Sequence, residues 1–114
     1  MSDAVRRLPK SAQTDLIRIL AYLESLKPQK IVLFGSAVWG EFTKDSDLDL
    51  FVVQETDKDW FTRTVDAQRH LPNKNTPLDL LINTPSEVAE AVRKRNPFYE
   101  QILREGVVLY ESQR

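Results

Sequence analysis

The spacing of apolar residues predicts helices in several parts of the chain. Residues 11–26 place leucines at helical intervals on one side, with Ser11 as the expected N-cap and Pro28 ending the helix. Residues 57–71 form a second amphipathic segment, for which Asp57 is the expected cap. Proline and glutamate start signals predict two further helices, within residues 84–96 and 97–106.

Short apolar runs between these helices predict strands, at residues 30–34, 47–53, 77–83 and 107–111. In the second run, alternation places Asp47, Asp49 and Phe51 on one face and leucines on the other. Because only a very short link joins the first two strands, we expect them to be antiparallel neighbours. The order of elements predicts an α/β (α+β) fold, with a mixed sheet of about four strands flanked by helices.

Length and composition fit a single domain over residues 1–114. The 16 basic and 17 acidic residues give a formal net charge of −1, so no overall attraction to nucleic acid is expected. The chain has no cysteine, which excludes disulfides, thiolate metal sites and a cysteine nucleophile. No apolar run approaches the roughly 18 residues that span a bilayer, so we expect a cytoplasmic protein with no membrane partner.

Asp47 and Asp49 are the first pair of residues that suggests chemistry. Two residues along a strand advance the chain by about 6.6 Å and keep both side chains on one face. The two negative charges repel each other unless a cation compensates them. Two divalent ions about 3.5–4 Å apart would do so, and oxygen-only ligands favour Mg²⁺ or Mn²⁺ over zinc. For an isolated Asp-x-Asp, a solvated edge strand is the alternative interpretation.

Asp79 strengthens the case for a metal site, because it interrupts the apolar run PLDLLI. Burying an unpaired carboxylate in such a strand is costly. If this strand lies beside residues 47–53, Asp79 can meet Asp47 and Asp49 on one face and complete a three-carboxylate site. The alternative is that Asp79 only marks the start of its strand.

The Gly35–Ser36 turn follows the first strand and precedes these carboxylates. Glycine permits close backbone approach, and serine can present its hydroxyl and nearby N–H groups to phosphate oxygens. Most Gly-Ser turns are only turns. A phosphate-binding turn followed by a metal-binding strand is nevertheless the combination that phosphoryl transfer from a nucleoside triphosphate requires.

The segment GSAVWGEFTKDSDLD, in which ten residues separate Gly-Ser from Asp-x-Asp, resembles the signature of the DNA polymerase β-like nucleotidyltransferase superfamily. The surrounding IVLFGS, SDLDLFVV, LDLLI and EGVVLYE make the chain most similar to its smallest members, the minimal nucleotidyltransferases. The resemblance covers nearly the whole chain. It implies a polymerase β palm-like fold, with the site on one face of the mixed sheet.

The resemblance also implies roles for individual residues. Asp47 and Asp49 would bind two Mg²⁺ ions, and Asp79 would bind the catalytic ion and help to activate the attacking hydroxyl. Gly35 and Ser36 would hold the β- and γ-phosphates of ATP while the α-phosphorus is attacked in line and pyrophosphate leaves.

Relatives of this size often work beside a HEPN-domain protein encoded by the adjacent gene. In such toxin–antitoxin pairs, the minimal nucleotidyltransferase is the antitoxin and transfers AMP from ATP to a tyrosine of the HEPN ribonuclease toxin. The resemblance therefore implies an adenylyltransferase with a HEPN toxin as partner and no direct contact with nucleic acid. Two alternatives stay open: a non-catalytic antitoxin that acts by occlusion, and an enzyme that modifies small molecules of the antibiotic kind.

One stretch departs from the family pattern. Many relatives continue the Gly-Ser turn with Ala-Arg-Gly, where this chain has Val38, Trp39 and Gly40. The missing arginine removes a phosphate or loop contact, and Lys44 in the same loop is the nearest cation that could replace it. Trp39 could stack on the base, contact a partner or pack locally against Phe42.

Overall fold

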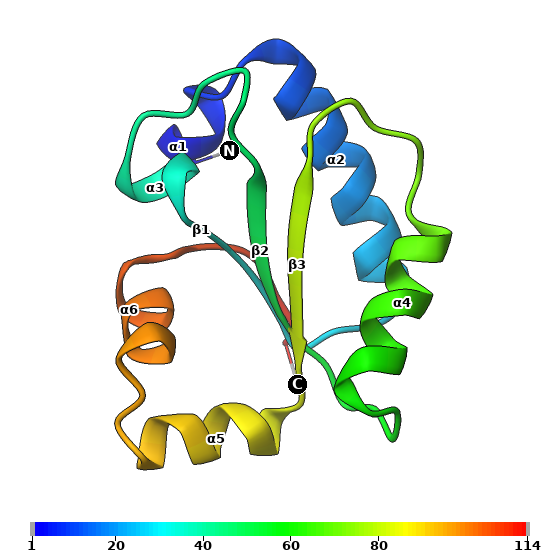
Figure 1. The fold of residues 1–114 in the computed structure, drawn as a ribbon, viewed down its shortest axis with the longest axis vertical. Coiled ribbons are helices and arrows are strands. Elements are labelled where there is room, and N and C mark those ends of the chain that lie inside the picture. Colours follow the sequence, from blue (N-terminus) through cyan, green and yellow to red (C-terminus); the bar gives the residue numbers. More distant parts are fainter. Residues whose placement is uncertain (1, 114) are drawn as a thin grey trace.

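The computed structural model describes residues 2–113, which form six helices and four strands (Figure 1). Within these residues, every helix is too short or too polar to cross a bilayer. In chain order the elements are α1 Asp3–Arg6, α2 Lys10–Ser25, β1 Lys30–Phe34, α3 Ser36–Trp39, β2 Leu48–Val53, α4 Trp60–His70, β3 Leu78–Asn83, α5 Pro85–Arg93, α6 Pro97–Glu105 and β4 Val107–Glu111.

The strands form one mixed sheet in the order β3-β2-β1-β4. β1 is antiparallel to both β2 and β4, whereas β2 and β3 are parallel. Helix α4 connects the parallel pair, which lies side by side in Figure 1, because parallel neighbours need a crossover connection. The expected class, a mixed sheet flanked by helices with its first two strands antiparallel, is confirmed.

Alternation along β2 separates two apolar clusters, one on each face of the sheet. Leu48 and Leu50 are buried in the larger cluster, which includes residues of α1, α2 and α4. Phe51 belongs to the smaller cluster together with Ile102 of α6. Each fully buried side chain of this size contributes about 1.5–3 kcal/mol to stability. The predicted faces of β2 are confirmed, and Asp49 lies on the face of Phe51.

Two expected helix caps are wrong by two residues each. Helix α2 begins after Pro9 rather than Ser11, because Pro9 is still extended with a ψ of 152°. Helix α4 begins after Asp59 rather than Asp57, because Asp59 accepts a hydrogen bond of 2.7 Å from the N–H of Thr62. Two aspartates two positions apart offer the same capping group, so the sequence alone does not distinguish them.

Two single-turn helices were not predicted. Helix α1 is capped by Ser2, whose hydroxyl accepts a hydrogen bond from the N–H of Val5. Helix α3 follows Gly35 directly. Four residues are too few to show a helical period, so pattern analysis does not detect such elements. Helix α3 bears on the candidate site because it begins directly after β1, whose last residue, Phe34, pairs with Asp49.

Candidate active site

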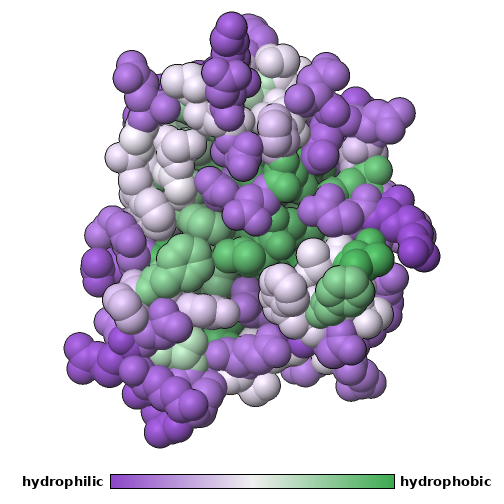
Figure 2. Space-filling model, viewed as in Figure 1, coloured by the Kyte–Doolittle hydropathy of each residue, from purple (hydrophilic) through white to green (hydrophobic). Residues whose placement is uncertain are grey.

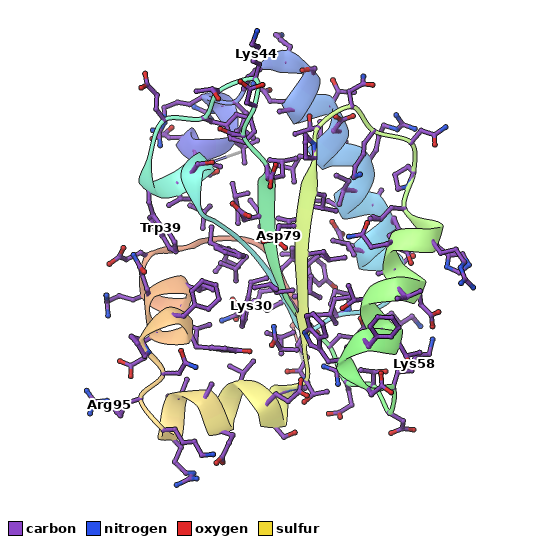
Figure 3. The ribbon with its side chains drawn as sticks, in the orientation of Figure 1. Lys30, Trp39, Lys44, Lys58, Asp79 and Arg95 are labelled. Atoms are coloured by element: carbon purple, nitrogen blue, oxygen red, sulfur yellow. The ribbon has the colours of Figure 1, made fainter. Side chains whose placement is uncertain are left out.

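Asp49 and Asp79 lie side by side on adjacent strands. They are direct register partners in the parallel pairing of β2 and β3. Partners in register point to the same face of a sheet, with strands about 4.8 Å apart. Figure 3 labels Asp79 beside β2 and β3, in the upper half of the sheet. The structure thus brings together two of the three predicted carboxylates.

Asp47 lies just ahead of β2 and is exposed. Its position two residues before Asp49 places it toward the same face. The negative charge of Asp47 acts on Asp49 together with that of Asp79. Asp47 is therefore an electrostatic neighbour of the pair, although it stands outside the regular strand.

Asp49 has a shifted protonation equilibrium. Burial raises its pKa, and the negative charges of Asp79 and Asp47 raise it further, to about 6. A hydrogen bond that the protonated Asp49 donates to Asp79 also favours the neutral form. A shared proton or a bound cation would each relieve the repulsion between these carboxylates.

Gly35 brings the end of β1 directly against Asp49. Its φ of 77° lies in the left-handed region, and a Cβ at this position would overlap Oδ2 of Asp49. Only glycine allows this close approach of backbone and carboxylate. The carbonyl of Gly35 accepts hydrogen bonds from the N–H groups of Val38 and Trp39, at 2.9 and 2.8 Å. Ser36, the first residue of α3, follows directly after this contact.

Lys44 lies on an exposed turn of the loop between α3 and β2. The N–H of Thr43 donates a 2.9 Å hydrogen bond to the hydroxyl of Ser46, which closes this turn. Figure 3 shows Lys44 at the top of the molecule, directed away from Asp79. In this conformation the structure does not bring Lys44 to the carboxylates.

Trp39 packs against Phe34, with ring centroids 6.0 Å apart and a tilt of 48°. Phe34 also contacts Phe98 of α6 edge-on, with centroids 5.9 Å apart. Phe42, the partner considered from the sequence, instead packs on the larger cluster of the opposite face. Sequence reasoning did not connect Phe34 or Phe98 with the site. The position of Phe34 immediately before Gly35 was the available signal.

Residues 17–114 match the family described as "Polymerase beta, Nucleotidyltransferase". This range includes all of the described strands together with Gly35, Asp47, Asp49 and Asp79. The chain belongs to this family. Membership agrees with the resemblance seen in the GS…DxD segment.

Two similar proteins place this nucleotidyltransferase among known relatives. A protein of Methanocaldococcus jannaschii named "putative protein adenylyltransferase" is 34% identical over 84 residues, which are 72% of this chain and 78% of the relative. A crystal structure described as a "putative nucleotidyltransferase" from Sulfolobus solfataricus has a TM-score of 0.54 at 18% identity. That match covers 94% of this chain and 93% of the other, and it shows the shared fold.

The carboxylates of this nucleotidyltransferase suit a hard divalent cation. Oxygen-only ligands match the preference of Mg²⁺, and a cation would offset the repulsion between the charges of Asp49 and Asp79. Within residues 2–113, no three acidic or histidine side chains already converge as a complete ion site. Asp49 and Asp79 offer two carboxylate ligands side by side, and Asp47 lies near them as a candidate third ligand.

A hollow of about 730 Å³ lies at the other end of the same face. Its lining includes Val88 of α5, Leu103 of α6 and the ion pair between Lys30 and Glu111, whose atoms are 3.5 Å apart. None of the six predicted site residues lines it. The hollow and the acidic group are separate features of this face.

Proposed function

We propose that this protein is an Mg²⁺-dependent adenylyltransferase that transfers AMP from ATP to a hydroxyl group of a partner protein. The observation that carries the proposal is the Asp49–Asp79 pair, in which Asp49 packs against Gly35. This contact sets a candidate phosphate-binding turn beside a candidate cation site. The name of the M. jannaschii relative supports a protein as the acceptor.

The proposed reaction is an in-line displacement at the α-phosphorus of ATP. The Gly35–Ser36 turn would hold the β- and γ-phosphates, while Asp47, Asp49 and Asp79 would hold Mg²⁺. When bound, Mg²⁺ would offset the negative charge of the phosphates. The acceptor oxygen bonds to the α-phosphorus as the bond to the bridging oxygen of the β-phosphate breaks, and pyrophosphate leaves. Asp79, an exposed carboxylate on the outermost strand, would accept the hydroxyl proton.

We further propose that the partner is a HEPN-domain toxin and that the acceptor is one of its tyrosines, which makes this protein the antitoxin. The resemblance to minimal nucleotidyltransferases supports this assignment. The formal net charge of −1 also supports a protein acceptor, because nucleic-acid binding depends mainly on basic residues that neutralise phosphates.

Incubation with ATP, MgCl₂ and the product of the adjacent gene tests the proposal. Intact-protein mass spectrometry should show the partner gaining AMP units with the wild type. The control variant Asp45→Asn, which changes an exposed aspartate in the loop between α3 and β2, should give the same gain. Asp49→Asn should give no gain. A wild type that binds its partner in the presence of Mg²⁺ and ATP without modifying it would contradict an enzymatic role.

The same variants separate the alternative functions. Neutralisation of the partner that survives the double substitution Asp47→Ala and Asp49→Ala would show occlusion instead of catalysis. Pyrophosphate release with hydroxylated small molecules, but not with the partner protein, would show that the acceptor is a small molecule.

A further inference from the structure

An aromatic surface made by three elements borders the carboxylates. Phe34 ends β1, Trp39 ends α3 and Phe98 lies in the first turn of α6. Phe34 is buried and contacts both other rings, with centroid distances of 6.0 and 5.9 Å. Trp39 and Phe98 are 37% and 45% exposed. We call these three residues the aromatic ledge.

The aromatic ledge adjoins the acidic pair through the sheet itself. Phe34 is the register partner of Asp49 in the antiparallel pairing of β1 and β2. Asp49 is in turn the register partner of Asp79. One row across the sheet therefore contains an aromatic ring and then two carboxylates, with neighbouring strands about 4.8 Å apart.

The surface shows the same juxtaposition. Figure 2 shows hydrophobic surface across the middle of the face that carries the site, bordered above by hydrophilic surface. Figure 3 shows Trp39 beside the site, on the side of α6, in contrast to the outward-pointing Lys44. A large apolar area that stays exposed next to a polar site indicates a ligand with both characters.

The geometry points to the aromatic ledge as the binding surface for the base of the nucleotide. This inference rests on the proposed function, since the phosphates of that nucleotide would lie at the acidic pair. A nucleotide combines a charged triphosphate with a flat aromatic base, which matches the row from Asp49 to Phe34. Every base presents a π-face to an aromatic side chain, so stacking gives affinity with little selectivity. ATP and GTP should accordingly bind with similar affinity, and pyrimidine nucleotides more weakly because of their smaller rings.

The chain offers a direct spectroscopic test, because Trp39 and Trp60 are its two tryptophans. In the Trp60→Phe variant, all tryptophan fluorescence comes from Trp39. Titration with ATP and Mg²⁺ should quench this fluorescence. Titration with inorganic tripolyphosphate and Mg²⁺, which offers the phosphates without a base, should not. ATP that binds by calorimetry without quenching Trp39 would overturn the inference.

Substitutions give a second measurement by calorimetry, independent of turnover. Trp39→Ala should weaken ATP binding about tenfold and leave tripolyphosphate binding unchanged, whereas Trp39→Phe should retain most of the ATP affinity. Phe98→Ala, on a different helix, should show the same selective loss of ATP affinity. It replaces Trp39→Ala as the test should that variant fold poorly. Phe61→Ala is the matched control, because Phe61 is a 69% exposed aromatic on α4.

The outcomes distinguish failure of this inference from failure of the proposed function. Equal weakening of both ligands by Trp39→Ala, or no weakening of either, would exclude the aromatic ledge as the base site. If Trp39→Ala leaves ATP binding unchanged but loses the complex with the partner, the aromatic ledge is a protein interface instead. If neither ATP nor tripolyphosphate binds the wild type with Mg²⁺, the proposed function itself is wrong.

Discussion

Asp49 rests against the backbone of Gly35, and at the scale of single residues this contact determines which substitutions the site tolerates. The backbone at Gly35 is left-handed, and the space above it is filled by the carboxylate. Both observations exclude a side chain at position 35. Asp49 is constrained from its other side by the like charge of Asp79. The site therefore combines steric and electrostatic crowding.

Gly35→Ala should destabilise the protein by about 1–3 kcal/mol, because the new Cβ overlaps Asp49 and the backbone is strained. Displacement of Asp49 should also abolish nucleotide transfer. Urea denaturation and the mass assay measure the two effects. Gly40→Ala is the matched control, since its Cβ would meet atoms no nearer than 3.9 Å and its φ is −143°. A similar loss of stability and of transfer activity in Gly35→Ala and Gly40→Ala would contradict an explanation based on the contact with Asp49.

Asp49→Asn should stabilise the metal-free protein at pH 7. The ordinary pKa of this carboxyl is 3.8 and its pKa in the fold is about 6. Between these values the folded state retains a proton that the unfolded state has released, so wild-type stability rises as the pH falls from 7 toward 5. Solvent screening at this partly exposed group limits the expected gain to about 1 kcal/mol at pH 7.

Urea denaturation in EDTA at pH 7 and pH 5 measures this effect. The gain from Asp49→Asn should be smaller at pH 5, because the wild-type carboxyl is then largely neutral. Asp45→Asn, on the exposed turn, should change stability by less than about 0.5 kcal/mol at either pH. If Asp49→Asn raises the stability equally at pH 7 and pH 5, charge repulsion is not the cause of the gain.

At the scale of elements, a buried carboxylate on α2 holds the loop that leads into β3. Oδ2 of Asp15 accepts hydrogen bonds from the N–H groups of Asn75 and Thr76, at 3.1 and 2.8 Å. The carbonyl of Pro77 then accepts a hydrogen bond from Leu48 at the start of β2. These bonds fix where β3 begins relative to β2. They consequently support the register that pairs Asp79 with Asp49.

Asp15→Ala should destabilise the protein by about 2–3 kcal/mol, because it leaves the amide of buried Thr76, and that of Asn75, without their acceptor. Burial raises the pKa of Asp15, but the hydrogen bonds from Thr76 and Asn75 lower it by more, so the net pKa is lowered. The contribution of Asp15 is therefore present above its unfolded pKa and lost as the pH falls through the folded value.

Urea denaturation at pH 7 and pH 3 tests this contribution, and the stability advantage of the wild type over Asp15→Ala should shrink at the lower pH. Asp15→Asn keeps an oxygen acceptor, so its stability at pH 7 should lie between that of the wild type and that of Asp15→Ala. A wild type and an Asp15→Ala variant of equal stability at pH 7 would exclude this role for Asp15.

The sequence predicted the long elements well and the short ones poorly. Amphipathic spacing located α2 and α4, and apolar runs located all four described strands, because both signals repeat over several residues. Helix α3 repeats nothing within its four residues and depends on the turn at Gly35. The choice of Asp59 over Asp57 as a cap depends on where the chain approaches the sheet, which local sequence does not encode.

At the scale of the whole molecule, the sheet has one face for stability and one that also carries the acidic residues. Period-two alternation in DLDLFVV was sufficient to separate these faces. The parallel register that aligns Asp49 with Asp79 was not predictable from alternation alone, since it depends on the loop before β3 and its contact with Asp15. The aromatic ledge was also not predictable, because its three residues come from elements that only the tertiary fold brings together.

Binding of Mg²⁺ should stabilise the whole fold, because folded Asp49 and Asp79 lie together whereas the unfolded chain separates them. At 100 times its Kd, a ligand specific to the folded state adds about 2.7 kcal/mol, which raises the Tm by several degrees. Thermal denaturation at pH 7.5 with MgCl₂, against NaCl of equal ionic strength, measures this shift. Asp79→Asn should remove it, and an unchanged shift in that variant would place the ion elsewhere.

The position of β3 at the edge of the sheet has a consequence for solubility. An outer strand presents backbone groups that can pair with another molecule, and a charged side chain on it opposes such pairing. Asp79 is an exposed charge on this strand, whose remaining residues are leucines, isoleucine and asparagine. The carboxylate that we assign to proton transfer therefore also protects an open edge against self-association. Light scattering of Asp79→Asn should show more association than the wild type, so oligomeric state has to be matched before its loss of activity is assigned to chemistry.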